Sequence, residues 1–165
     1  MSNTKADAQQ HLKDLLRDFS IGMLVTRTSA DRLRARPMAI ADVDEDDVLY
    51  FVTDIESAKV DEAQARPQSQ LILQDARRQI SVSGTLRVLN DRSLVKRLWS
   101  EPMRVWFPKG GEDPSITILA FEAAEGEYWD NSGMNGIKYL FKAAKAYATG
   151  ARPASDVSEH GKAAL

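Results

Sequence analysis

The chain opens with apolar residues repeated at the spacing of a helix. Leu12, Leu15, Leu16 and Phe19 recur every three or four positions, and charged residues separate them. Beyond this segment the period shortens to that of strands, in short runs that are rich in Val, Ile and Thr. The pattern therefore predicts an N-terminal amphipathic helix over residues 4–19, followed by a largely β domain.

The strand-like runs are separated by turns rich in Asp, Gly and Pro. Six strands are predicted, over residues 21–28, 34–43, 48–53, 70–74, 79–89 and 116–121, the last resuming over 125–129. Pro37 within the second run indicates an edge or bulged strand, because proline cannot donate to a sheet ladder. Helices are predicted over residues 58–66, from the N-cap Asp91 to about residue 100, and over residues 136–148.

These elements predict a mainly β (α+β) fold, an antiparallel barrel of six strands with peripheral helices. A parallel sheet would need a helical crossover after nearly every strand, and too few helices are predicted for that. The length of 165 residues suits one domain, predicted over residues 1–149. The tail over residues 150–165 is rich in Ala, Ser and charge, and it is predicted to be disordered.

Composition removes several classes of site and partner. The chain has no Cys, which excludes disulfides, thiolate metal sites and cysteine nucleophiles. Its two histidines, His11 and His160, lie near opposite ends, so neither a metal site nor a Ser-His-Asp triad is expected. The formal net charge of −2 gives no electrostatic reason to expect nucleic acid or an anionic membrane as a partner. No apolar run approaches a membrane span and residues 1–10 lack a signal-peptide core, so the cytoplasm is the expected compartment.

Ser57-Ala58-Lys59 lies at the junction between the strand over 48–53 and the helix over 58–66. A helix start presents unpaired backbone N–H groups, and a Ser hydroxyl with a Lys ammonium there would complete a cradle for phosphate. The alternative is an ordinary helix start at which Ser57 is the cap and Lys59 is solvated. Taken alone, the segment favours this alternative.

The second strand carries two arginines ahead of a small apolar stretch. Arg34 and Arg36 alternate, so both guanidinium groups point to one face. Pro37-Met38-Ala39 follows and could lie flat against a planar ligand. The alternative is a pair of solvent-facing arginines on an edge strand, and in isolation it is the better interpretation.

Two later strands add polar and aromatic candidates. Gln79 and Ser81 share one face of their strand, opposite the apolar Ile80 and Val82, which also fits a half-buried strand with its polar side in water. Trp129 ends the last strand, where the alternative is a ring that seals the end of a barrel.

Taken together, these segments resemble the pyridoxamine 5′-phosphate oxidase-like flavin split barrels. The resemblance rests on the segments Arg36-Pro37-Met38, Tyr50 to Lys59, Arg78 to Gly84 and Glu127-Tyr128-Trp129. Within that superfamily the chain is most similar to the general stress protein 26 group, through Ala35 to Ala39, Asp54 to Lys59, Val82-Ser83-Gly84, Trp106-Phe107-Pro108 and Tyr128-Trp129-Asp130. The likeness covers about residues 10–130, and the order and spacing of the motifs make it specific.

The resemblance implies a split β-barrel that forms a homodimer, with two flavin sites at the interface and both chains contributing to each. The implied cofactor is FMN, with FAD as the alternative. Arg36, Ser57, Ala58 and Lys59 would hold its phosphate, and Thr53 would lie near the phosphate or the ribityl chain. The other implied cofactor-binding residues are Val52 and, at or near the isoalloxazine ring, Pro37, Met38, Ala39, Gln79, Ser81 and Trp129.

One segment departs from the oxidase pattern. The oxidases carry an Arg-Leu-His segment shortly after the terminal Trp, whereas Asn131 to Asn135 reads Asn-Ser-Gly-Met-Asn here. Oxidation of pyridoxamine phosphate is therefore not expected. The function predicted is a stress-related flavoprotein, a flavin-dependent oxidoreductase of unidentified substrate in which no catalytic residue is assigned.

Two alternatives to this function stay open. The first is a non-catalytic flavin binder that acts as a carrier or a stress sensor. The second, weaker alternative replaces flavin with deazaflavin or haem on the same barrel. Haem is disfavoured because the chain has no Cys and neither His11 nor His160 lies in the predicted barrel.

Overall fold

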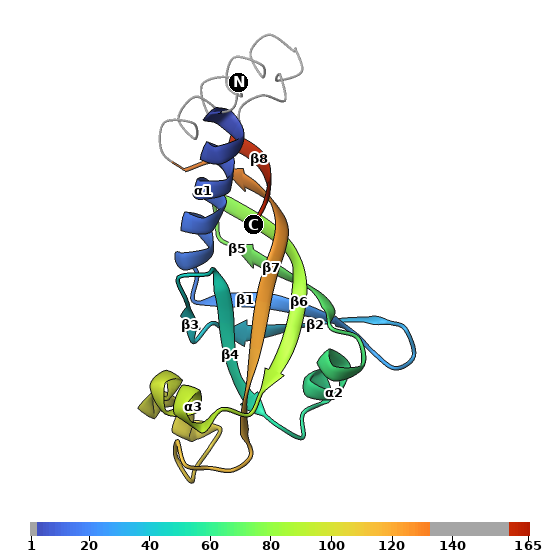
Figure 1. The fold of residues 1–165 in the computed structure, drawn as a ribbon, viewed down its shortest axis with the longest axis vertical. Coiled ribbons are helices and arrows are strands. Elements are labelled where there is room, and N and C mark those ends of the chain that lie inside the picture. Colours follow the sequence, from blue (N-terminus) through green and yellow to red (C-terminus); the bar gives the residue numbers. More distant parts are fainter. Residues whose placement is uncertain (1–2, 133–158) are drawn as a thin grey trace.

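The computed structural model describes residues 3–132 and 159–165. The first half of the chain forms α1 (Asn3–Arg17), β1 (Ile21–Arg27), β2 (Leu33–Ala39), β3 (Asp42–Val43), β4 (Val48–Asp54) and α2 (Ala58–Ala65). The second half forms β5 (Gln68–Gln74), β6 (Arg78–Leu89), α3 (Arg92–Leu98), the 3₁₀ helix η1 (Glu101–Val105), β7 (Ile116–Asp130) and β8 (Glu159–Ala164). The strands make one sheet that curls into a half-barrel, with the helices around it (Figure 1).

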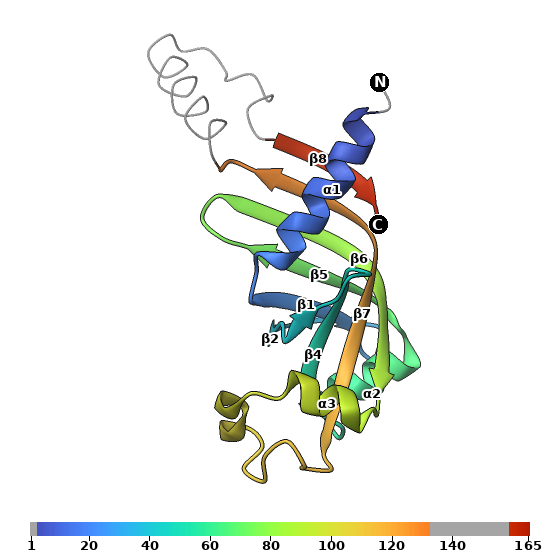
Figure 2. The same cartoon turned by 60° about the vertical axis from the view of Figure 1, so that its left-hand side comes forward.

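The sheet is antiparallel throughout, in the order β2-β1-β5-β6-β7-β4-β3, and β8 pairs with β7. β6 and β7 pair along the whole of β6, with one bulge between Ser83 and Gly84. Glycine is needed at this bulge, because a Cβ on Gly84 would lie 2.2 Å from the carbonyl oxygen of Glu122. β7 carries β4 on its first half and β8 on its second half, so one long strand joins both ends of the half-barrel (Figure 2).

The predicted mainly β, antiparallel fold is confirmed, and so are three of its helices. α1, α2 and α3 form where the sequence predicts them, and the carboxylate of Asp91 caps α3 by accepting hydrogen bonds from the backbone N–H groups of Ser93 and Leu94. The predicted helix over residues 136–148 lies outside the described residues.

The strand count is higher than the six predicted. The run over residues 34–43 divides into β2 and β3, because the backbone N–H of Ile40 donates to Ser20 and that of Ala41 donates to Tyr50. The runs over residues 116–121 and 125–129 are a single strand, β7.

The prediction of a disordered tail over residues 150–165 is wrong for its last residues, which form β8 along the second half of β7. This half of β7 would otherwise present an unpaired edge, and β8 pairs with it. Residues 150–158 lie outside the described part of the chain.

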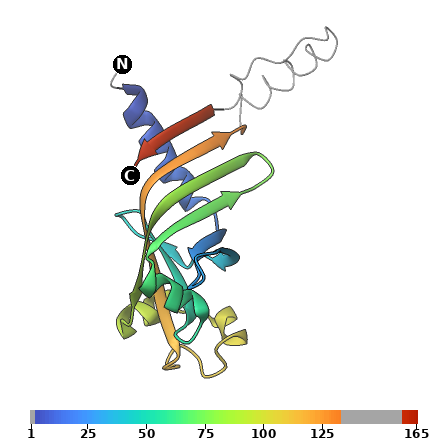
Figure 3. The ribbon, with the colours of Figure 1, turned by 90° about the vertical axis from the view of Figure 1, so that its right-hand side faces the viewer.

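α1 lies against the concave side of the sheet and closes the core. Leu12, Leu15 and Leu16 are at most 3% exposed, as the helical pattern predicts. Asp47 of the β3–β4 turn is also buried, and it pairs with Lys13 Nζ at 2.7 Å and with Arg17 Nη2 at 2.6 Å. These ion pairs hold α1 over the core beside β8, far from α2 at the other end of the sheet (Figure 3).

The opposite, outer face of β1, β2 and β5 is apolar and exposed in the single chain. Ile21 is 60% exposed, and Met23 and Ile72 are 38% exposed each. Met23 pairs with Pro37 of β2 on one side and with Ile72 of β5 on the other, so these side chains form a continuous surface. We call this surface the outer apolar face.

α2 is fixed to the sheet by a buried carboxylate, Glu62, whose contacts we call the Glu62 clamp. Glu62 Oε2 accepts hydrogen bonds from Arg36 Nη2 at 2.8 Å and from Thr26 Oγ1 at 2.5 Å, and Oε1 accepts one from Arg34 Nη1 at 3.0 Å. Arg36 Nη1 in turn donates to Thr26 Oγ1 at 2.5 Å. One side chain of α2 therefore joins β1 and β2, and it sets the direction of both arginines.

Replacing Glu62 by Gln removes the charge but keeps the shape of the clamp. Burial raises the pKa of Glu62, but hydrogen bonds from Thr26 and Arg36 and the charges of both arginines outweigh burial and hold the pKa below its ordinary value of 4.5. The clamp therefore stabilises the fold fully above that value, and its contribution is lost as the pH falls through the lower pKa of the folded chain. We expect E62Q to lower the free energy of unfolding by about 2 kcal/mol near neutral pH.

Urea denaturation of both proteins across a pH series measures this difference. Asp61→Asn is the matched control, because Asp61 is the exposed neighbour of Glu62 on the same helix, and we expect it to change the free energy of unfolding by less than about 0.5 kcal/mol. The clamp would be contradicted if the difference in free energy of unfolding between wild type and E62Q stayed constant as the pH fell to about 3.

Candidate functional site

The start of α2, where the sequence predicts a phosphate cradle, gathers three polar side chains. Lys59 Nζ donates a hydrogen bond to Thr53 Oγ1 at 3.0 Å, and Ser57 Oγ lies 3.4 Å from the same oxygen. Ser57 stands at the N-cap position of α2, but its hydroxyl makes no capping hydrogen bond. Lys59 is half-buried. An ordinary cap beside a solvated lysine therefore does not describe this segment.

Arg36 reaches this end of the sheet from β2, through the Glu62 clamp. The two arginines share a face as predicted, but they differ in exposure: the side chain of Arg36 is 16% exposed and that of Arg34 is 54% exposed. The interpretation of two solvent-facing arginines is therefore wrong for Arg36.

The cations at the start of α2 differ in their partners. Arg34 and Arg36 share the buried carboxylate of Glu62, whereas Lys59 Nζ bonds the neutral hydroxyl of Thr53. The carboxylates of Asp54, Glu56 and Asp61 lie along the same segment. Burial lowers the pKa of Lys59, and the charge of Arg36 lowers that pKa further, against the opposing charges of Asp54 and Glu62. A half-buried ammonium that is destabilised in this way is relieved by an added anion.

This arrangement fits a phosphate group. Two fixed cations and the hydroxyls of Ser57 and Thr53 supply the hydrogen-bond donors that phosphate oxygens accept, and the positive end of α2 adds to them. Thr53 is 5% exposed, so it contacts Lys59 from the buried side. The pairing of β4 with β7 fixes the position of Thr53. The site is built by the strand–turn–helix β4–α2, as the sequence indicates.

The residues that follow Arg36 divide between the two faces of β2. Pro37 and Ala39 are exposed on the outer apolar face, opposite Met23 and Ile21 of β1. Met38 lies on the other face and packs against the core. Val52, also predicted to bind the cofactor, packs against the smaller core cluster beneath α3.

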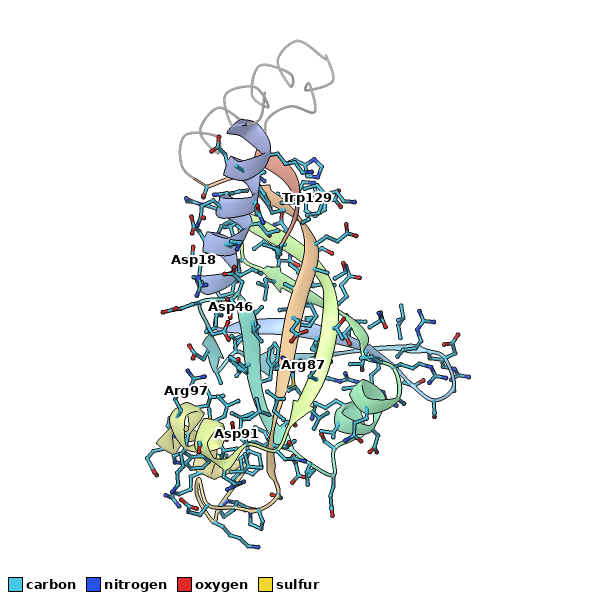
Figure 4. The ribbon with its side chains drawn as sticks, in the orientation of Figure 1. Asp18, Asp46, Arg87, Asp91, Arg97 and Trp129 are labelled. Atoms are coloured by element: carbon cyan, nitrogen blue, oxygen red, sulfur yellow. The ribbon has the colours of Figure 1, made fainter. Side chains whose placement is uncertain are left out.

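The predicted ring-contacting residues of β6 and β7 are brought together at the far end of the sheet. Gln79 lies directly opposite Trp129 in the β6–β7 ladder, and Ser81 Oγ accepts a hydrogen bond from Gln70 Nε2 of β5 at 2.5 Å. Trp129 lies beside β8, away from α2 (Figure 4). Within one chain the structure does not bring this group to the start of α2.

A hollow of about 330 Å³ lies over β1, β5 and β6. It is lined by Thr26 of the Glu62 clamp and by Gln70, the hydrogen-bond partner of Ser81, together with Val25, Leu33, Ser83 and Thr85. Its volume is at the low end of the range for small-molecule sites. The surface of these three strands is therefore indented.

Four residues of this region were missed by the sequence interpretation: Thr26, Glu62, Gln70 and His160. Glu62 carried the one usable signal, because it lies three positions after Lys59 on a predicted helix and so shares its side. His160 gave none, since it falls in a tail without a strand pattern.

The described residues also bear on metal binding and on membrane insertion. Among residues 3–132 and 159–165, no group of three or more His, Asp or Glu side chains is arranged to hold a metal ion. Within the same part of the chain, no helix is both long and apolar enough to cross a membrane.

Known proteins share this fold over most of its length. The general stress protein 26 of Jannaschia sp. CCS1 is 28% identical to this chain, with a TM-score of 0.76 over 97% of this chain and 99% of that one. Protein bli-3 of Neurospora crassa is 26% identical over 76% of this chain and 68% of its own length. The general stress FMN/FAD binding protein of Xanthomonas citri is 20% identical, with a TM-score of 0.65 over 76% and 92% of the two chains, which shows a shared fold.

The family follows from a longer match along the sequence. Residues 7–154 fit the model of the family described as pyridoxamine 5′-phosphate oxidase like. This range includes β2, the β4–α2 junction, β6 and β7, the elements that carry the cradle and Trp129. The chain belongs to the pyridoxamine 5′-phosphate oxidase-like family.

Proposed function

We propose that this protein binds FMN, with FAD as the alternative, between two copies of the chain and acts as a flavin-dependent oxidoreductase. The observation that carries the proposal is the half-buried Lys59, whose Nζ bonds the neutral hydroxyl of Thr53, beside Ser57 and Arg36. The name of the Xanthomonas citri relative, an FMN/FAD binding protein, supports the same ligand class.

The phosphate end of the ligand would be held by residues of one chain. Lys59 and Arg36 supply charge, and the hydroxyls of Ser57 and Thr53 supply directed hydrogen bonds. Ala58, exposed at the first position of α2, leaves the approach to the helix start free of a bulky side chain. The Glu62 clamp keeps Arg36 in place before the ligand arrives, which reduces the entropy lost on binding.

The ring end would rest on apolar surface and would require a second copy. Pro37 and Ala39 lie on the outer apolar face, which is exposed in the single chain, whereas Gln79, Ser81 and Trp129 lie at the far end of the sheet. A second copy that covers the outer apolar face would bring its own Gln79, Ser81 and Trp129 to the start of α2 in the first chain. The homodimer thus accounts both for the exposed apolar residues and for the division of the candidate residues.

When bound, a flavin supplies hydride or electron transfer, and the protein supplies binding, orientation and electrostatics. Just after Trp129, the backbone N–H of Ser132 donates a hydrogen bond to the Asp130 carboxylate. Residues 131–135 do not contain the Arg-Leu-His segment with which the oxidases recognise pyridoxamine phosphate. We therefore propose a substrate other than pyridoxamine phosphate.

One observation favours the alternative of a non-catalytic flavin carrier or stress sensor. The side chains that pair across the outer apolar face, from Pro37 and Ala39 through Met23 to Ile72, are all uncharged. No general acid or base is therefore present on that surface in one chain. Reduction of the FMN-loaded protein with a nicotinamide donor without oxygen, followed by air, separates the two functions. We expect turnover above that of free FMN, and tight binding without turnover would identify a carrier or sensor instead.

The cradle is tested by Lys59→Ala, with FMN and riboflavin as matched ligands. Riboflavin lacks the phosphate, so the loss of Lys59 should raise the Kd for FMN about tenfold and leave the Kd for riboflavin within about twofold. Quenching of flavin fluorescence measures both affinities. Lys96→Ala is the control, because Lys96 is 66% exposed on α3 and pairs with the exposed Glu112. Equal losses for FMN and riboflavin would show that Lys59 does not contact the phosphate.

The dimer is tested by placing charge on the outer apolar face. Met23 and Ile72 are cross-strand partners, and a lysine at either position would have to be buried without a partner in the proposed interface. We expect light scattering to show that Met23→Lys and Ile72→Lys are monomers. We also expect the Kd for FMN to rise at least tenfold in both variants. Val105→Lys serves as the control, since Val105 is 79% exposed on η1, outside this face. A Met23→Lys dimer with unchanged FMN affinity would refute the interface.

A further inference from the structure

β8 places a histidine on the tryptophan of the candidate site. His160 is the register partner of Trp129, and their rings stack with centroids 5.0 Å apart and planes 13° apart. His160 Nε2 lies 3.6 Å from Glu127 Oε1, on the same face of the sheet. The side chain of His160 is 47% exposed, so the imidazole is both held by the stack and open to solvent.

The position of His160 is set by the sheet rather than by the flexibility of a chain end. On the opposite face of β8, Ala163 is 3% exposed and belongs to the core. Gly161 packs so closely on Tyr128 that a Cβ would lie 2.4 Å from the phenol ring. A slip of one residue would bury His160 or Lys162 against Tyr128, so the register that faces His160 towards Trp129 is specified.

Two histidines lie at this end of β7: His160 stacks on Trp129, and His11 Nε2 lies 3.1 Å from Asp130 Oδ2 on the opposite face of the strand. Glu125 and Glu127 of β7 and Lys162 of β8 share its face, β6 contributes the neutral Gln79 and Ser81, and Arg77 lies in the adjoining β5–β6 turn. Carboxylates, lysine and arginine keep their charge between about pH 5 and 8, whereas histidine does not. Among the described residues, His160 is therefore the histidine that shares a face with Trp129.

We propose that His160 is a positioning and charge-tuning residue of the flavin site, whose protonation favours the reduced form of the bound flavin. The inference rests on the proposed function, which places Trp129 and Gln79 near the ring. Reduction adds electrons, and thus negative charge, to the ring, so a nearby imidazolium stabilises the reduced form more than a neutral imidazole does. Stacking on Trp129 keeps this charge at one place, and the salt bridge to Glu127 orients Nε2.

The test compares the affinity for oxidised and reduced FMN in wild type and in His160→Phe. Phe keeps an aromatic ring for the stack on Trp129 and removes the titration. The ratio of the Kd for oxidised FMN to the Kd for reduced FMN is measured without oxygen at about pH 5.5 and about pH 8. We expect this ratio to rise towards low pH about fivefold more in wild type than in H160F. Protonation of free FMN contributes equally to both proteins and cancels in the comparison.

Two further proteins complete the experiment. His160→Gln keeps a polar side chain without a proton that titrates in this range, and it should behave as H160F does. Lys162→Met removes a charge from the same face of β8 but leaves His160, so the pH dependence should persist. An equal pH dependence in wild type, H160F and H160Q would overturn the inference while leaving FMN binding intact. If wild type binds neither form of FMN, the proposed function fails and this inference fails with it.

Discussion

The buried carboxylate of Glu62 is the interaction on which the candidate site depends. It joins α2 to β1 and β2 at one point, and it compensates the charge of Arg36, which would otherwise be costly to bury. Lys59 is half-buried nearby and bonds the neutral hydroxyl of Thr53, and the charges of Asp54 and Glu62 also act on it. The clamp thus fixes the start of α2 and the direction of Arg36. The proposed phosphate site rests on the same cluster.

The sheet separates the two groups of candidate residues by its own geometry. β5 and β6 form a hairpin in which Gln74 pairs with Gln79, and β5 begins just after α2. Gln79 and Trp129 therefore stand at the far end of the hairpin from the cradle. Met23 and Ile72 are exposed on the outer apolar face, and the hollow beside Thr26 is lined mainly by polar residues. In the proposed function, a second chain that covers the outer apolar face would complete the site.

The parts of this structure that could be predicted from the sequence are those set by neighbours along the chain. The N-cap Asp91, the shared face of Arg34 and Arg36 and the helix start after Ser57 all follow from local spacing. The clamp could not be predicted, because Asp61 and Glu62 are adjacent acids and only packing against β1 decides which is buried. β8 was missed because its small and polar residues carry no strand pattern and its partner, β7, is distant in the chain.

β8 also changes what the departure from the oxidase pattern means. The segment after Trp129 lacks the Arg-Leu-His of the oxidases, which suggests a site without a titrating group beside the tryptophan. The fold returns a histidine to that tryptophan from the other edge of β7, in a register that Gly161 and Ala163 enforce. This histidine stacks on the indole and does not project past the end of the strand. Its position therefore suits an electrostatic role rather than direct contact with a substrate. The absence of the Arg-Leu-His segment and the presence of a histidine on the tryptophan are therefore separate features of one strand end.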